Sequence, residues 1–157
     1  MTVTEYAYGT ATDNSHWVGY PFSNCFDNNE VTYFNQDPAP NPWIGTMDYG
    51  SGVSHIINLY TIQGYSTFTP SEWSVYGSNN GSSWDLLDSR SGESFTPSEI
   101  KTYRFENTTA YRYYKFVFTG GENKAIIEVE LKYDDAPPTP AVGGVSMGSA
   151  NAMMVGM

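Results

Sequence analysis

One ten-residue segment, CFDNNEVTYF at positions 25–34, carries the side chains whose types and spacing most clearly predict chemistry. Asp27, Asn29 and Thr32 place three oxygen-bearing side chains close together, and the backbone carbonyls of the same loop are further oxygen donors. Calcium binds six to eight oxygens without a preset geometry, which suits such a loop. The segment therefore predicts a calcium site. An alternative stays open: an Asx-turn in which Asp27 accepts hydrogen bonds from backbone amides and no metal is bound.

Other metal or catalytic chemistry is not indicated by the sequence. Zinc sites use His and Cys, but His16, His55 and Cys25 have no ligand spacing. The single cysteine excludes an internal disulfide and is interpreted as a small buried residue. A glycosidase needs two carboxylates facing each other across a groove, and the sequence shows neither that arrangement nor a nucleophile motif. We expect a protein that is not an enzyme.

The charge balance restricts the partners. The net charge is −10, and only seven of the 157 residues are Lys or Arg. Nucleic-acid and anionic membrane surfaces are therefore disfavoured. The sequence has no apolar stretch long enough to span a bilayer. Met1 leads directly into polar residues, so no signal peptide is expected. The cellular location is left undetermined; export by another route and display on a virion surface both fit.

The segment 72–90, EWSVYGSNNGSSWDLLDSR, predicts a β-hairpin. Trp73 and Val75 alternate with polar neighbours, which is the period of a strand with one buried face. Asn and Gly at 79–81 tolerate a positive φ, so the chain can reverse there. A second strand then starts at Trp84, with Asp85 and Asp88 expected to face water. We expect the three tryptophans on strands, Trp43, Trp73 and Trp84, to be core residues. His55 is interpreted as structural.

Further strands are indicated along the rest of the chain by runs of alternating or continuous apolar residues. Aromatic residues make up 16% of the sequence and no long amphipathic helical pattern appears, which favours an all-β fold. About eight short strands separated by turn residues predict a β-sandwich. The expected strands outside the hairpin are 3–11, 43–48, 54–62, 100–105, 111–119 and 125–133.

The chain resembles the discoidin domain, also called the coagulation-factor C-type domain, and within it the bacterial carbohydrate-binding modules of the galactose-binding-like fold. The similarity is carried by five pieces in family order, which together cover about residues 3–134. They are YPFSNCFDNNEVTYF, PWIGTMDYG, EWSVYGSNNGSSWDLLDSRSG, ESFTPSEIKTYRFENTTAYRYYKFVF and AIIEVELKY. The resemblance implies a jelly-roll sandwich whose loops at one end bind the ligand. It also implies that Glu128, on the last strand, completes a structural calcium site with Asp27, Asn29 and Thr32.

Three loops, 13–22, 34–42 and 62–71, match the projecting ligand loops of that family. Sugars present apolar faces edged with hydroxyls, so aromatic rings beside amides and an imidazole suit them. For Trp17, a core position covering the end of the sandwich stays open as the alternative to binding. The candidate ligand-binding residues are His16, Trp17, Tyr20, Asn35, Gln63 and Tyr65.

The composition changes at Ala136, which divides a sandwich domain, 1–135, from a linker and Met-rich tail, 136–157. The tail is uncharged and small in its side chains, so we expect it to pack on another copy or on a larger scaffold. The expected function is a non-catalytic carbohydrate-binding module with structural calcium that mediates adhesion to glycans. The alternative is a structural or decoration protein of a larger assembly, such as a phage virion or tail, that displays the sandwich outward.

Overall fold

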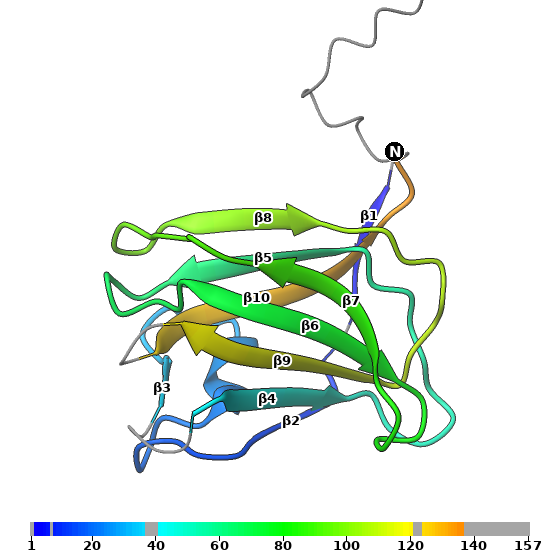
Figure 1. The fold of residues 1–157 in the computed structure, drawn as a ribbon, viewed down its shortest axis with the longest axis horizontal. Helices are drawn as coiled ribbons and strands as arrows, with labels where there is room; N and C mark the ends of the chain where they lie inside the picture. The colour runs from blue at the N-terminus through cyan, green and yellow to red at the C-terminus, as the bar shows by residue number, and fades with distance from the viewer. Residues whose placement is uncertain (1, 7, 37–40, 121–123, 137–157) are drawn as a thin grey trace, which may run out of the picture.

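Ten strands in two antiparallel sheets make up most of the fold (Figure 1). The computed structural model describes residues 2–6, 8–36, 41–120 and 124–136. In this part of the chain one short 3-10 helix, η1 (Phe22–Phe26), is the only helix, and no helix is long and apolar enough to cross a membrane. The expected all-β sandwich is confirmed, with ten strands in place of about eight. The tail from 137 onward lies outside the described residues, so its predicted packing stays a prediction.

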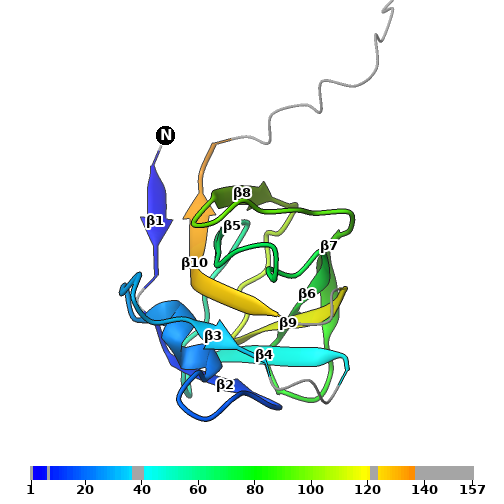
Figure 2. The same ribbon diagram turned by 90° about the vertical axis from the view of Figure 1, so that its left-hand side faces the viewer.

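The first sheet has β10 as its central strand. The strand order is β1-β10-β5-β8, and β3 pairs with the beginning of β10 on the same side as β1. Figure 2 shows β1 alongside the end of β10 at the edge of the molecule. The strands are β1 (Val3–Glu5), β3 (Phe34–Asn35), β5 (Leu59–Gly64), β8 (Ile100–Arg104) and β10 (Ala125–Asp134).

The second sheet, in the order β2-β4-β9-β6-β7, contains the predicted hairpin. Trp73 on β6 lies opposite Arg90 on β7, and a bulge interrupts the pairing after Val75. The strands are β2 (Thr10–Asp13), β4 (Trp43–Asp48), β6 (Glu72–Ser78), β7 (Asp85–Arg90) and β9 (Tyr113–Gly120).

The core between the sheets is predominantly aromatic. The Trp43 ring stacks on Phe34, with 3.9 Å between ring centroids, and on Phe118, with 4.6 Å. The Trp73 indole N–H donates to the Tyr60 hydroxyl at 2.8 Å, and that hydroxyl donates to Asp88 Oδ2 at 2.8 Å. This chain of hydrogen bonds satisfies polar atoms that burial would otherwise leave unpaired. Trp43, Trp73 and Cys25 are buried as expected.

Several sequence-based expectations are wrong in detail. The segment 3–11 is not one strand, because its two ends, β1 and β2, belong to different sheets. Regular pairing in 54–62 begins only at Leu59, and His55 forms a single bridge with Tyr111. Asp88 does not face water; it bonds the core hydroxyl just described. Trp84 is not a core residue but lies on the outer face, with the Lys115 ammonium 3.9 Å from its ring centroid.

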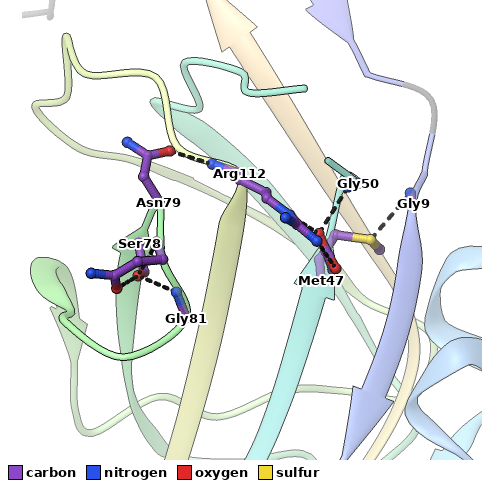
Figure 3. A network of polar contacts seen from close by, with 9 residues as sticks. Gly9, Met47, Gly50, Ser78, Asn79, Gly81 and Arg112 are labelled. Carbon is purple, nitrogen blue, oxygen red and sulfur yellow. Dashed lines mark hydrogen bonds and ion pairs between the residues drawn. The ribbon is translucent and has the colours of Figure 1, made fainter. Parts of the chain in front are cut away.

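A polar network closes the end of the sandwich where β4 ends and β9 begins (Figure 3). Arg112 donates to both carboxylate oxygens of Asp48, at 2.7 and 2.9 Å, and the backbone N–H of Arg112 donates to Asn79 Oδ1 at 2.9 Å. Asp48 also accepts the Gly50 N–H at 2.8 Å. These contacts tie the β6–β7 turn to β4 and β9. The candidate site lies at the other end of the sandwich.

Candidate functional site

An aromatic pocket of about 200 Å³ lies at the loop end of the sandwich. Its walls come from four separate segments: loop 13–22, the segment after η1 that continues into β3, the β5–β6 loop, and the first residue of β10. The described lining residues are Trp17, Tyr33, Asn35, Tyr65, Phe68 and Ala125.

Backbone hydrogen bonds fix the position of Trp17 in this pocket. Trp17 N donates to Asn35 O at 3.0 Å, and Asn35 N donates to Tyr20 O at 3.1 Å. Tyr20 N closes the turn by donating to Trp17 O at 2.9 Å, with Gly19 between them at φ +90°. The Trp17 side chain is 50% exposed, so the alternative of a core tryptophan does not hold.

Three tyrosine rings support the opposite wall. Tyr33 stacks on Tyr65 with 4.3 Å between centroids, and Tyr20 lies behind Tyr33 at 4.7 Å. Tyr65 is 39% exposed and Phe68 51%. The pocket therefore presents aromatic surface from several sides, and the Asn35 amide adds a polar group to the tyrosine hydroxyls among the described lining residues.

The structure brings together only some of the predicted ligand residues. Trp17, Asn35 and Tyr65 line the pocket, and Tyr20 lies directly behind it. His16 turns to Asp13, with 2.8 Å between Nδ1 and Oδ1. Gln63 is only 7% exposed and lines a different hollow beside Glu128 and Glu130.

Tyr33 and Phe68 complete the pocket but were not among the predicted binding residues. For Tyr33 the sequence does carry a signal. Its neighbour Phe34 is a core residue, and neighbouring strand residues face opposite sides. Tyr33 must therefore point away from the core.

The predicted calcium residues do converge, between the loop after η1 and β10. Asp27 accepts the Asn29 N–H at 3.0 Å and the Thr32 hydroxyl at 2.6 Å. Glu128 Oε1, on β10, accepts the same Asn29 N–H at 3.0 Å. Asn28 adopts φ +54°, which turns the loop back on itself. The Asp27–Asn29 contact is also the hydrogen bond of an Asx-turn, so both alternatives named for this loop remain.

The electrostatics of the loop favour neutralisation of Glu128 by a proton or a cation. Burial, together with the neighbouring Asp27 carboxylate, raises the pKa of Glu128 to about 7. Glu128 Oε2 is buried and makes no hydrogen bond within the described residues. A buried carboxylate oxygen without a partner is costly unless a proton or a cation neutralises it.

Any cation here must depend on more than carboxylates. Among the residues that the structure describes, no group of three or more His, Cys, Asp or Glu is placed to hold a metal. The amide of Asn29, the hydroxyl of Thr32 and loop carbonyls must supply the remaining ligands. These are hard oxygen donors, which suits calcium rather than zinc.

Comparisons with known proteins bear on the family and the fold of the chain. A family model described as the F5/8 type C domain matches residues 4–131. No curated protein matches the chain. A solved structure of CpGH89CBM32-5 from Clostridium perfringens, in complex with GalNAc-β-1,3-galactose, superposes with a TM-score of 0.66 at 19% identity. The match covers 78% of this chain and 93% of that one.

Two further solved structures share the fold. The family 32 carbohydrate-binding module of C. perfringens NanJ, in complex with galactose, has a TM-score of 0.69 at 17% identity and covers 79% of this chain and 93% of its own. Chitosan-binding module 1 of a chitosanase/glucanase from Paenibacillus sp. IK-5 has a TM-score of 0.69 at 18% identity and covers 83% and 99%. At these identities the superpositions establish the jelly-roll fold.

Proposed function

The chain belongs to the F5/8 type C domain family, and we propose that it is a carbohydrate-binding module whose sugar site is the aromatic pocket at the loop end. The observation that carries the proposal is the combination of exposed Trp17, Tyr65 and Phe68 rings with the Asn35 amide in one concave site. Aromatic faces pack on the C–H faces of a pyranose, while an amide both donates to and accepts from its hydroxyls.

The volume of the pocket and the net charge of the protein narrow the class of sugar that could bind. A pocket of about 200 Å³ fits one pyranose ring. The net charge of −10 disfavours uronic acids and other anionic sugars. Two structural relatives bind GalNAc-β-1,3-galactose and galactose. The chitosan-binding module and the CBM32 of AlyQ, in complex with 4,5-unsaturated mannuronic acid, share the fold, so the choice rests on the charge of this chain. A neutral hexose or N-acetylhexosamine at the end of a glycan is therefore the proposed ligand.

The role proposed for this binding is adhesion. One pocket that holds one sugar ring gives weak binding, since each ligand atom contributes little and the contact area is small. Several copies on one particle or one polypeptide would convert weak contacts into firm attachment. We assign the protein no chemical step.

Calcium is proposed as a structural ion held by Asp27, Asn29, Thr32 and Glu128. The support is the meeting of two carboxylates at the Asn29 N–H and the buried, unpartnered Glu128 Oε2. Calcium would supply positive charge that neutralises these oxygens. Thr32 immediately precedes Tyr33, so fixing the loop also fixes one wall of the pocket.

A glycan array probed with the purified protein, with calcium and with chelator, tests the proposed function. We expect binding to glycans that end in neutral galactose or N-acetylgalactosamine, stronger with calcium than with chelator. If the folded protein binds no glycan under either condition, the proposed function is wrong.

A further inference from the structure

A second and larger cavity, of about 440 Å³, lies at the opposite end of the first sheet from the aromatic pocket. Asn58, just before β5, lines this cavity, whereas Tyr65, just after β5, lines the aromatic pocket. Likewise Ala125 begins β10 at one pocket and Asp134 ends it at the other. β10 has ten residues, so the two cavities are roughly 30 Å apart. Figures 1 and 2 show β5, β8 and β10 running between the two ends.

An ion pair between a half-exposed arginine and a buried aspartate forms the polar part of this terminal cavity; the Arg104 side chain is 47% exposed. The Asp134 side chain is only 3% exposed, and its carboxylate pairs with Arg104 Nη1. Asn58 fixes the Asp134 backbone on both sides: it accepts the N–H and donates to the C=O, each at 2.8 Å. One nitrogen of the Arg104 guanidinium is therefore held at a fixed carboxylate, while the rest of the side chain reaches solvent. Within the described residues its Nε and Nη2 make no hydrogen bond, so these N–H groups can donate to a ligand.

Acceptors and apolar surface lie beside this guanidinium. Glu106 and Asp135 are exposed at the cavity rim. Half-buried Phe105 and Tyr133 supply flat apolar surface in the wall. Asp135 Oδ1 already accepts the Thr2 N–H at 2.7 Å, and Asp134 Oδ1 accepts the Ala136 N–H at 2.8 Å. The Glu106 carboxylate and Asp135 Oδ2 are therefore the acceptors that the cavity offers beside the Arg104 N–H groups and the aromatic rings.

We propose that this terminal cavity is a second ligand site, for a hexopyranose bound through two neighbouring hydroxyls. A vicinal diol donates and accepts at the same time, so it matches a guanidinium next to carboxylates. The sugar ring would lie against Phe105 and Tyr133, as pyranose C–H faces do on aromatic rings. A volume of about 440 Å³ accommodates at least one hexose. The inference does not depend on the aromatic pocket being a sugar site. If both sites bind, one domain can bridge two glycan chains.

Backbone amide NMR shift mapping on the full chain tests this site. D-galactose, D-glucose and D-mannose are titrated separately, because their C2–C4 hydroxyls cover trans and both cis arrangements. Cyclohexanol serves as a six-membered ring without a diol. We expect at least one hexose to shift the amides of Asn58, Arg104 and Tyr133, and cyclohexanol to leave them unmoved. If no hexose shifts these amides, or if cyclohexanol shifts them equally, the inference is wrong.

Two variants separate this site from the proposed function. Arg104→Lys keeps a cation beside the buried Asp134 but removes the forked donors, so terminal-site affinity should fall about tenfold, as expected for lost charged hydrogen bonds. Trp17→Ala should leave the terminal shifts unchanged. Shifts confined to the loop pocket would overturn the second site and leave the proposed function standing. Shifts confined to the terminal cavity would do the reverse. An unchanged affinity in Arg104→Lys would overturn the diol contact.

Discussion

Tyr33 and Tyr65 stack with 4.3 Å between ring centroids, although they lie on separate loops that the sequence separates by about thirty residues. Tyr33 follows the proposed calcium loop, and Tyr65 follows β5. The stack therefore joins the proposed calcium loop to the wall of the proposed sugar site. Its integrity should affect binding more than stability, because both rings are at the surface.

Changes at Tyr33 test this wall. Tyr33→Ala should weaken sugar binding severalfold, because it removes a pocket ring and the support of Tyr65. Tyr33→Phe keeps the ring and should bind like the parent protein. Titration calorimetry with galactose and N-acetylgalactosamine provides the measurement. Equal loss in both variants would mean that the hydroxyl, not the ring, makes the contact.

Chelation tests the calcium proposal. A ligand that binds only the folded state stabilises it, by about 2.7 kcal/mol when its concentration is a hundred times Kd. The chelator should therefore lower the melting temperature of the parent protein, and Asp27→Ala should abolish the difference. Glu72→Ala, an exposed acid on β6, is the control and should respond like the parent. If the parent melts at the same temperature with and without chelator, the loop is an Asx-turn without metal.

The pH dependence of the metal-free protein follows from Glu128. Its folded pKa of about 7 lies above the ordinary glutamate value of 4.5, so the folded state binds more protons than the unfolded state between these pH values. Stability should then fall as the pH rises from about 4.5 to 7. Chemical denaturation in chelator, across this range, measures the slope. Glu128→Gln should flatten it; an unchanged slope would show that another group is responsible.

The hydroxyl of Tyr60 should be a strong determinant of stability. It accepts from Trp73 and donates to Asp88 inside the sandwich. Tyr60→Phe leaves both groups without that partner and should cost about 1–3 kcal/mol of unfolding free energy. Tyr76→Phe, on the outer face, is the matched control and should change stability little. A loss of the same size in both variants would contradict the role of the buried hydroxyl.

The strands could be predicted from sequence where the pattern is local. In β6 and β9 a buried residue recurs at every second position. The sequence alone therefore predicts that Trp73 and Phe116 face the core, without knowledge of the partner strands. β4 appears with its predicted bounds because prolines precede it and glycine follows it. The convergence of Asp27, Asn29 and Thr32 was also predictable, since the three residues are close in sequence; calcium binding there stays a prediction.

Other features depend on contacts between residues far apart in the chain, which the local sequence pattern does not predict. The chain crosses from one sheet to the other between β1 and β2, and only the pairing with β10 and β4 shows this. Gln63 lies only two residues before Tyr65 in the predicted ligand loop, yet it belongs to β5, where it pairs with Glu128 and lies away from the pocket. Trp84 looks like a core residue by type, but the bulge and turn of the hairpin place it outside, under Lys115.

Trp17 is the residue on which the account depends most. Its indole is half exposed at the edge of the pocket, held there by the Trp17–Asn35 backbone hydrogen bond. Stacking a pyranose on it should contribute on the order of 1 kcal/mol beyond plain burial. Because the backbone bond survives truncation of the side chain, Trp17→Ala should lose binding while keeping nearly all its stability.

Calorimetric titration of the parent, Trp17→Ala and Trp84→Ala with the same galactose- or N-acetylgalactosamine-terminated glycan is the most direct test of the sugar site. Trp84 is a second tryptophan outside the core, on a different face, so its removal controls for general loss of aromatic surface. The account predicts severalfold weaker binding in Trp17→Ala and parent-like binding in Trp84→Ala. Parent-like binding at the loop pocket in Trp17→Ala, in a fully folded protein, would contradict it.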